Sequence, residues 1–296
     1  MVILFNTEGR FGHQLSQFVT LIAYSEEYNR TFHHWKFQSR FAGFFNKTNT
    51  LLFTKASFKI FFFFLLYKVL KIFSVKHLIL FDVEFHITNK KRNELVFDDI
   101  IEQLFLSNAK YVVTDYVFND VPKLIKYKDF ITSQLIPSTT LQIQTDDLIS
   151  LLRSKHSKII GVHIRRGDFK KFENGIFYFN DAAYCFVLDQ FIKIINTSQS
   201  NIAFVICSDE KIDVNKYKAF NIYAEQRTVA EDFFILAKCD YIIAPRSIFS
   251  TMANYFSNNK IYQIIDADKQ FLMKDFLESK ELLASKYNLK EIKDFI

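Results

Sequence analysis

The stretch that decides the fold of this chain is Ile159-Ile-Gly-Val-His-Ile-Arg-Arg-Gly-Asp-Phe169. Its apolar first half is typical of a buried β-strand, and the strand ends in two adjacent arginines, a glycine and an aspartate. The planar guanidinium groups of Arg165 and Arg166 can bind phosphate through paired hydrogen bonds. Gly167 allows the backbone to turn, and Asp168 supplies a hydrogen-bond acceptor or a base. The stretch therefore predicts a site for a phosphorylated, nucleotide-linked substrate.

The sequence around this stretch predicts a parallel sheet with helices on both faces. Strand-like and helix-like segments alternate as they do in such folds. We expect strands at 159–164, 202–207, 240–244 and 260–265, and helices at 181–196, 228–238, 247–257 and 270–283. Ligands of these folds bind at the carboxyl ends of the strands. Those ends carry His163 to Asp168, Ser208 and Asp209, and Pro245 to Ser250.

The first half of the chain predicts a second α/β unit with a weaker pattern. We expect strands at 2–6, 77–83 and 110–114, and helices at 13–29, 98–107 and 143–154. Segment 36–75 is poorly patterned and is interpreted as an insertion. A chain of 296 residues is long enough for two domains, and we expect the boundary near 150–158.

Glycine is scarce, with six residues in the whole chain. Gly9 and Gly12 flank a turn that leads from the first expected strand into a helix, whose N-terminus could bind an anion. Gly167 lies in the arginine loop, and Gly175 follows soon after it. In a chain that otherwise avoids glycine, these positions indicate backbone with positive φ or a close approach to a ligand.

Composition and charge narrow the class of partner. The net charge of +6 comes from basic residues that are scattered along the chain, without the aromatic–basic pattern of a nucleic-acid platform. We therefore expect no nucleic-acid partner. Three widely spaced cysteines fit neither a zinc site nor a disulfide framework. Together with an N-terminus that lacks a basic leader, they favour a reducing, cytoplasmic location.

The longest apolar run, Ile60-Phe-Phe-Phe-Phe-Leu-Leu-Tyr67, is too short to span a bilayer, which needs about 20 residues. Lys59, Lys68 and Lys71 surround it. Two interpretations of 58–75 remain open: a basic amphipathic helix in peripheral contact with the inner face of a membrane, or a helix buried in the first half.

Four segments together carry a resemblance to a known family. His163-Ile-Arg-Arg-Gly-Asp168 resembles the H-x-R-R-G-D motif of GDP-fucose-dependent fucosyltransferases, especially the α-1,2-fucosyltransferases of glycosyltransferase family 11. Gly9–Phe18 is similar to the opening glycine turn of that family, and Ile206–Glu210 is similar to its S-D-D motif. Glu231–Ser250 resembles its last conserved block, although Pro245-Arg-Ser247 replaces the usual Asn-Ser.

The resemblance implies an α/β fold of the GT-B type, in which two Rossmann-like domains with parallel sheets face each other across a cleft. Residues 1–155 would form the acceptor-side domain, and residues 156–296 would bind the GDP-sugar donor. The implied reaction is an inverting, metal-independent transfer of L-fucose from GDP-β-L-fucose to the 2-hydroxyl of galactose in a glycan. No cofactor is expected. As acceptor we expect a surface polysaccharide or a lipid-linked oligosaccharide, which would place the protein in polysaccharide biosynthesis.

The same resemblance implies roles for single residues. Arg165 would bind the β-phosphate and stabilise the departing GDP, with Arg166 in support, and His163 and Asp209 would contact the guanosine. The full set of expected donor-binding residues is Gly9, Gly12, His163, Arg165, Arg166, Ser208, Asp209, Arg246, Ser247, Ser250 and Thr251. The last three lie at the start of an expected helix, where hydroxyl and N–H groups can hold phosphate.

The catalytic base has two candidates. An inverting transfer needs a carboxylate or its equivalent near the acceptor hydroxyl. Asp168 is the first candidate. Glu173, five residues further on, resembles an acidic residue proposed for this role in related α-1,6-fucosyltransferases.

Two other functions are considered. Asp266-Ala-Asp268 follows an apolar run, as the metal-binding D-x-D motif does in GT-A glycosyltransferases, but only 28 residues follow it, so a surface turn is the favoured interpretation. The arginines could also form the docking patch of a non-enzymatic protein that binds nucleotides or anionic glycans.

Overall fold

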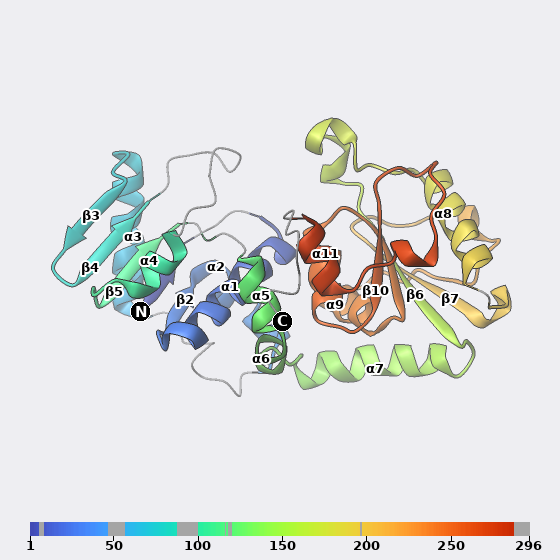
Figure 1. The fold of residues 1–296 in the computed structure, drawn as a ribbon, viewed down its shortest axis with the longest axis horizontal. Coiled ribbons are helices and arrows are strands. Elements are labelled where there is room, and N and C mark those ends of the chain that lie inside the picture. Colours follow the sequence, from blue (N-terminus) through green and yellow to red (C-terminus); the bar gives the residue numbers. More distant parts are fainter. Residues whose placement is uncertain are drawn as a thin grey trace. The chain divides into compact units, whose positions relative to one another are not determined.

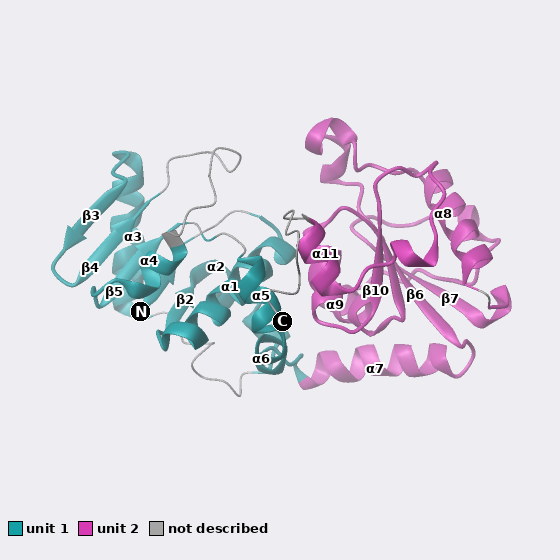
Figure 2. Ribbon diagram, in the orientation of Figure 1, with its two compact units in different colours: residues 1–138, 295–296 teal, residues 139–294 magenta. Residues whose placement is uncertain are grey.

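The computed structural model divides the chain into two compact units, coloured separately in Figure 2. The first contains Met1–Ser138, and the second begins at Thr139. Each unit has a five-stranded sheet with its own helices, most of which are labelled in Figure 1, so the predicted two-domain α/β fold is confirmed. The structure describes residues 1–5, 9–46, 57–87, 100–115, 117, 120–195 and 197–286.

The sheet of the first unit has the strand order β2-β1-β5-β4-β3. Its strands are β1 (Val2–Leu4), β2 (Phe32–His34), β3 (His77–Leu80), β4 (Val83–His86) and β5 (Tyr111–Thr114). All neighbours are parallel except β3 and β4, which form an antiparallel hairpin at one edge. β1 pairs with β2 and β5, and all three of its residues are fully buried, which explains its unbroken apolar sequence.

Six α-helices accompany this sheet in the described part of the first unit. They are α1 (Phe11–Tyr28), α2 (Trp35–Arg40), α3 (Phe58–Ile72), α4 (Ile100–Leu106), α5 (Val121–Lys126) and α6 (Lys128–Gln134). α1 is the longest and buries most of its side chains. It ends at Asn29, whose φ of 47° is the left-handed conformation that commonly terminates a helix.

The sheet of the second unit is entirely parallel, with the order β10-β9-β6-β7-β8. Its strands are β6 (Lys158–Ile164), β7 (Ile202–Ser208), β8 (Ile222–Tyr223), β9 (Tyr241–Pro245) and β10 (Lys260–Ile264). Its helices are α7 (Thr139–Arg153), α8 (Asp181–Ile194), α9 (Val229–Lys238), α10 (Ile248–Tyr255) and α11 (Ser279–Lys286). The sheet is wound in both directions from β6, because β7 lies on one side of it and β9 on the other.

The two faces of β6 pack against different helices. Ile160, Val162 and Ile164 belong to the same hydrophobic cluster as Tyr184, Leu188 and Phe191 of α8. Gly161 faces the other way, toward Leu236 and Cys239 at the end of α9. Alternate residues of the strand therefore point to helices on opposite sides of the sheet, as the period of a strand requires.

The sequence expectations differ from the structure at several places, and they omit β2, β8, α5 and α6 altogether. Residues 270–283 do not form one helix: a short 3₁₀ turn at Met273–Asp275 is followed by an extended segment and then by α11. The extended segment exists because Leu277 pairs with Ile261 of β10, and Phe276 is buried beside that strand. The segment 36–75 contains α2 and α3, and the edge strand β4 was not expected from the pattern.

The division between the units falls before α7 and not at residues 155/156. α7 belongs to the second unit because its polar side chains bond to the end of α9. The Lys238 ammonium donates to the Thr145 hydroxyl at 2.7 Å, and Arg153 pairs with Asp240 at 2.6 and 2.7 Å. These contacts link α7 to the end of α9 and to the residue just before β9.

We predict that Gly161→Ala destabilises the protein by about 1–3 kcal/mol, the usual cost of overpacking a core. The added Cβ would lie 2.6 Å from Leu236 Cδ2 and 3.1 Å from Cys239 Sγ, and both side chains are buried. Gly43→Ala is the matched control, because no atom lies within 4 Å of a Cβ at that position. Urea unfolding of both variants measures the difference, and equal stabilities would contradict the packing described for β6.

Candidate functional site

The candidate site lies where the strand order of the second unit reverses. β6 and β9 are neighbours, but the chain runs outward from them in opposite directions, and in such sheets ligands bind beyond the carboxyl ends of these two strands. Arg165 follows β6 directly, and Ser247 follows β9. The Arg165 Nη1 group donates to the Ser247 hydroxyl at 3.3 Å, so the structure joins these two predicted residues.

The Arg165 side chain is held on three sides. Its Nε and Nη2 atoms donate to the two carboxylate oxygens of Asp168 at 3.0 and 2.7 Å, and its guanidinium carbon lies 4.4 Å from the ring centre of Phe169. Three of its five N–H groups are used in the bonds to Asp168 and Ser247, which leaves two outside the hydrogen bonds of the described chain. Arg165 is therefore a fixed cation that can still bind an anion.

Arg166 has a different environment. Its guanidinium is buried and donates to the Phe179 carbonyl, the Glu210 carboxylate and the Asp181 carboxylate at 2.9, 3.0 and 2.5 Å. These partners outweigh the effect of burial and raise the pKa of Arg166. The side chain thus joins the arginine loop to α8 and to the loop after β7, and its hydrogen-bonding groups are directed into the protein, not outward to a ligand.

Asp181 shares this network with two further residues. Lys216 and the hydroxyl of Tyr217 both donate to its carboxylate, at 2.8 Å each. Burial opposes ionisation of Asp181, but the hydrogen bonds from Lys216, Arg166 and Tyr217 prevail and lower its pKa to about 2. The lowered pKa stabilises the fold above the ordinary pKa of an aspartate, and this contribution is lost as the pH falls toward 2.

His163 is buried and uncharged at neutral pH. Burial and the nearby Arg165 lower its pKa to about 3. Its ring centre lies 5.0 Å from that of Phe249, and its Nδ1 atom has no hydrogen-bond partner in the described chain. A buried polar atom without a partner is rare in proteins and indicates either a ligand or a water molecule.

The residues at the start of α10 divide into two groups. The Ser247 hydroxyl accepts the N–H of Phe249 at 3.3 Å and caps the helix. The hydroxyls of Ser250 and Thr251 both donate to the Ser247 carbonyl, at 3.2 and 2.8 Å, and both residues are buried. Ser250 and Thr251 therefore stabilise the first turn of α10 and point into the protein. The groups that could bind phosphate are the first N–H groups of α10 and the Ser247 hydroxyl.

Asp209 and Ser208 shape the loops from the β7 side. The Asp209 carboxylate accepts the backbone N–H groups of Arg166 and Gly167, at 3.0 and 3.5 Å. The Ser208 hydroxyl accepts the N–H of Glu210 at 3.2 Å. Arg246 is exposed and forms no hydrogen bond or ion pair with the described residues. Asp209 thus fixes the backbone from which Arg165 projects.

The two candidate bases differ in their surroundings. Asp168 is half-exposed and paired with Arg165. Glu173 is exposed in a short 3₁₀ segment, and it has a φ of 47°. Asn174 and Gly175 follow with φ of 57° and 81°, which makes three successive left-handed residues. Such strain in a non-glycine residue costs about 1–3 kcal/mol and is commonest at functional sites.

Gly9 and Gly12 lie in the first unit. Gly9 has a φ of 78°, and a Cβ there would lie 2.4 Å from the His13 ring, so the position requires glycine. Gly12 is in the first turn of α1. Residues 6–8, which precede Gly9, lie outside the described residues.

Sequence reasoning missed the residues that support the loop. Asp181 and Tyr217 bind Arg166 and belong to no motif, because their partner is far away in the sequence. Glu210 ended the segment that resembles the S-D-D motif, but its bond to Arg166 was not predicted. Arg227 was missed as well. It donates to Asp232 at 3.1 Å and to the Ile206 carbonyl at 2.6 Å beneath β7, and its buried Nη1 has no partner in the described chain.

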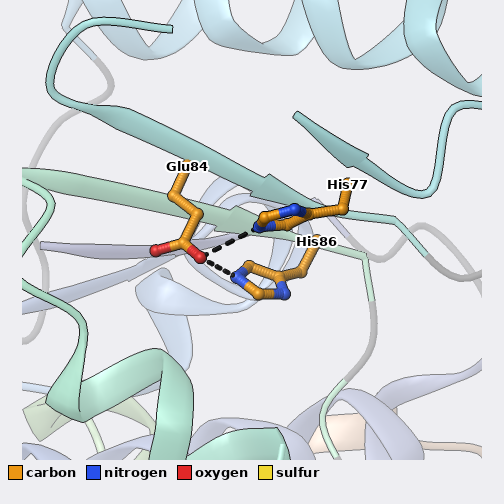
Figure 3. Close-up of side chains that lie close together, drawn as sticks. All are labelled: His77, Glu84 and His86. Atoms are coloured by element: carbon orange, nitrogen blue, oxygen red, sulfur yellow. Dashed lines mark hydrogen bonds and ion pairs between the residues drawn. The ribbon is translucent and has the colours of Figure 1, made fainter. Parts of the chain in front are cut away.

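Two groups of residues bear on metal binding. The exposed pair Asp266 and Asp268 forms a turn, in which the Asp266 carboxylate accepts the Asp268 N–H at 3.0 Å, as the surface-turn interpretation predicted. Among the described residues, one group of histidine and acidic side chains lies as close together as metal ligands do. It consists of His77, Glu84 and His86 of the first unit, drawn in Figure 3.

Comparisons with known proteins agree with this arrangement. The model of glycosyl transferase family 11 matches residues 3–283. NodZ, an α-1,6-fucosyltransferase of Bradyrhizobium crystallised and soaked with GDP-fucose, is 17% identical, with a TM-score of 0.57 over 93% of this chain and 96% of NodZ. A mutant of Arabidopsis thaliana FUT1 in complex with GDP is 9% identical, with a TM-score of 0.57 over 88% of this chain and 70% of FUT1. The search of curated proteins gave no match.

We predict that Arg166→Ala lowers the free energy of unfolding by about 3 kcal/mol, because it leaves two partly buried carboxylates without their cation. Arg246→Ala is the control, since that side chain is exposed and should change stability by less than about 0.5 kcal/mol. Urea unfolding measures both variants. A stability of Arg166→Ala equal to that of Arg246→Ala would contradict a structural role for Arg166.

Proposed function

Because the chain belongs to glycosyl transferase family 11, we propose that it transfers L-fucose from GDP-β-L-fucose to a glycan hydroxyl, with inversion and without a metal ion. The H-x-R-R-G-D segment at His163–Asp168 supports this proposal. The fold is shared with NodZ and FUT1, whose structures were studied with GDP-fucose and GDP. The observation that carries the proposal is the guanidinium of Arg165. It is held by Asp168 and Ser247 but keeps two N–H groups for an anion, and it lies where the strand order of the second unit's sheet reverses.

Arg165 supplies what the departing GDP needs. Cleavage of the bond between fucose and phosphate leaves negative charge on the β-phosphate, and a cation fixed in advance stabilises that charge without reorganising during the reaction. Asp168 and Ser247 hold Arg165 in place. The N-terminus of α10, beside Ser247, adds N–H groups for the same phosphate. Arg246, exposed beside it, adds a further positive charge.

The nucleoside has two candidate contacts. The unpartnered Nδ1 of His163 suits a hydrogen bond to the donor, because the neutral imidazole has one donor and one acceptor nitrogen. Asp209 holds the loop backbone through one carboxylate oxygen. We assign to Asp209 a contact with guanine N–H groups, which a carboxylate accepts well.

The pairing of Asp168 supports Glu173 as the base. The Asp168 carboxylate accepts two N–H groups of Arg165, so its two oxygens hold that guanidinium in place. Glu173 is exposed and lies on a backbone with positive φ, a feature that is commonest at functional sites. We therefore propose that Asp168 positions Arg165 and that Glu173 accepts the proton of the acceptor hydroxyl.

The acceptor proposal rests on the resemblance to the α-1,2-fucosyltransferases. We propose the 2-hydroxyl of galactose in a surface polysaccharide or lipid-linked oligosaccharide, and a cytoplasmic reaction at the inner face of the membrane. NodZ is an α-1,6-fucosyltransferase, so the shared fold is compatible with more than one linkage.

An exposed apolar stripe on α3 supports the membrane location. Ile60, Phe63, Tyr67 and Leu70 of this helix pack into the first unit. The opposite side of the helix exposes a second apolar row, consisting of Phe58, Phe61, Phe62, Leu65, Val69 and Ile72. Lys59 and Lys68 flank this row and are exposed. Aromatic and aliphatic residues between lysines fit the interface of an anionic bilayer.

Within the described residues, α3 and the other helices are too short or too polar to cross a membrane.

We predict that Arg165→Ala lowers kcat by about 10²–10³-fold, the usual effect of losing one preorganised donor at a developing anion. The assay measures GDP released from GDP-fucose in the presence of a galactoside. Stability should stay unchanged in urea unfolding. Arg40→Ala, an exposed arginine of α2, is the control for activity, and Glu173→Gln in the same assay tests the base.

A calorimetric screen of GDP-fucose, GDP-mannose and UDP-sugars accompanies this assay. Binding of UDP-sugars without GDP-sugars, or full activity of Arg165→Ala, would refute the proposed donor and the proposed role of Arg165. A strict requirement for manganese would favour the alternative function, a metal-dependent GT-A glycosyltransferase that uses Asp266 and Asp268. Binding of GDP-fucose without turnover with any acceptor would favour the non-enzymatic binder.

We predict that Phe62→Ser weakens binding to vesicles that contain anionic lipid by about tenfold, because a large apolar side chain loses about 1.5 kcal/mol of burial. Leu151→Ser on α7 removes an equally exposed apolar side chain and serves as the control. Vesicle sedimentation measures both. Equal binding of the two variants, or equal binding to neutral vesicles, would contradict contact of α3 with an anionic membrane.

A further inference from the structure

The hairpin of β3 and β4 collects three side chains that are separated in the sequence. His77 and His86 lie directly opposite each other in the antiparallel register, and Glu84 lies two residues before His86. Opposite residues share a face of the sheet, and so do residues two apart on one strand. The two imidazoles and the carboxylate therefore project from the same side of the hairpin, as Figure 3 shows.

The distances within this cluster are short. The Nε2 atoms of His77 and His86 lie 3.0 and 2.7 Å from the same Glu84 carboxylate oxygen. One ligand atom from each residue lies within 4.8 Å of the other two. Ligand atoms around a tetrahedral zinc ion are about 3.4 Å apart, given metal–ligand distances near 2.1 Å. Small side-chain movements would bring all three onto one ion.

The chemistry of the set fits a divalent transition metal. Two imidazole nitrogens and one carboxylate oxygen are a known three-ligand set for zinc, with a further position left for water. Glu84 and His86 are partly buried, and His77 is half-exposed, so an ion can reach the cluster from solvent.

The Glu84 carboxylate also accepts a hydrogen bond from a residue that is not itself a ligand, as metal ligands in proteins usually do. The Ser107 hydroxyl, just after α4, donates to the second oxygen of Glu84 at 2.5 Å. Ser107 is fixed in turn, because its hydroxyl accepts the Ala109 N–H at 3.1 Å and its carbonyl accepts a hydrogen bond from Arg30. Glu84 therefore presents the same oxygen to both histidines.

We propose that His77, Glu84 and His86 form a binding site for a divalent transition metal such as zinc. The ion would fasten the edge strand β3 to β4 and, through Ser107, to the segment between α4 and β5. This site belongs to the first unit, whereas Arg165 belongs to the second. We assign the ion a stabilising role, because it would join β3 to β4 and to Ser107, and this role is compatible with a metal-independent transfer reaction.

The test uses the full chain, stripped of metal with a chelator and titrated with Zn²⁺ in a calorimeter. We expect one equivalent to bind and the melting temperature to rise. His77→Ala, His86→Ala and Glu84→Gln should each weaken binding by about 100-fold or more, and Ser107→Ala by about 10-fold. Co²⁺ in place of Zn²⁺ should give visible absorption bands that are lost in His86→Ala.

His156→Ala is the matched control. His156 is a partly exposed histidine of the second unit that bonds to the Tyr223 hydroxyl at 2.9 Å. This variant should bind Zn²⁺ like the unaltered chain. Absence of a saturable one-to-one site, or affinity unchanged in His77→Ala and His86→Ala with circular dichroism showing an intact fold, would overturn the proposal. The cluster would then be a hydrogen-bonded pair of histidines on one carboxylate.

Discussion

The buried guanidinium of Arg166 is the interaction on which the second unit's site depends. It binds the first residue of α8, the loop after β7 and the Phe179 carbonyl at once. The two ends of the connection between β6 and α8 and the loop after β7 are thereby fixed against one another. A buried cation is tolerated only when such partners surround it, because an unpaired charge in the interior costs several kcal/mol. Loss of any one of these partners would therefore leave the buried Arg166 charge poorly compensated and would strongly destabilise the fold.

The two adjacent arginines differ because an extended chain alternates its side chains. Ile160, Val162 and Ile164 face α8, and Arg166 continues this series to the N-terminus of α8. Gly161 and His163 face the side of α9 and α10, and Arg165 continues that series to Ser247. One guanidinium is consequently enclosed by carboxylates, and the other is left with N–H groups for an anion. The Asp209 carboxylate holds the backbone between them.

The first unit contributes features of another kind. Its strand β1 is fully buried, but its edge hairpin and the outer side of α3 leave many apolar side chains exposed. Phe81, at the tip of the hairpin, is fully exposed and has a φ of 54°. A hairpin with so little burial gains few contacts from its own side chains, so links such as the His77–Glu84–His86 cluster matter more for its stability.

The sequence by itself determined the α/β class, most of the strands and helices, and the strand-end location of the arginines, because periodicity and strand-end motifs are local signals. It also indicated the family through four segments in order, and the match of the family model over residues 3–283 confirms this. Only the tertiary structure decided which arginine is enclosed, because Asp181, Glu210 and Tyr217 come from distant segments. It alone turned the hydroxyls of Ser250 and Thr251 inward and aligned His77 with Glu84 and His86. These outcomes depend on strand register and helix placement, which no short stretch of sequence encodes.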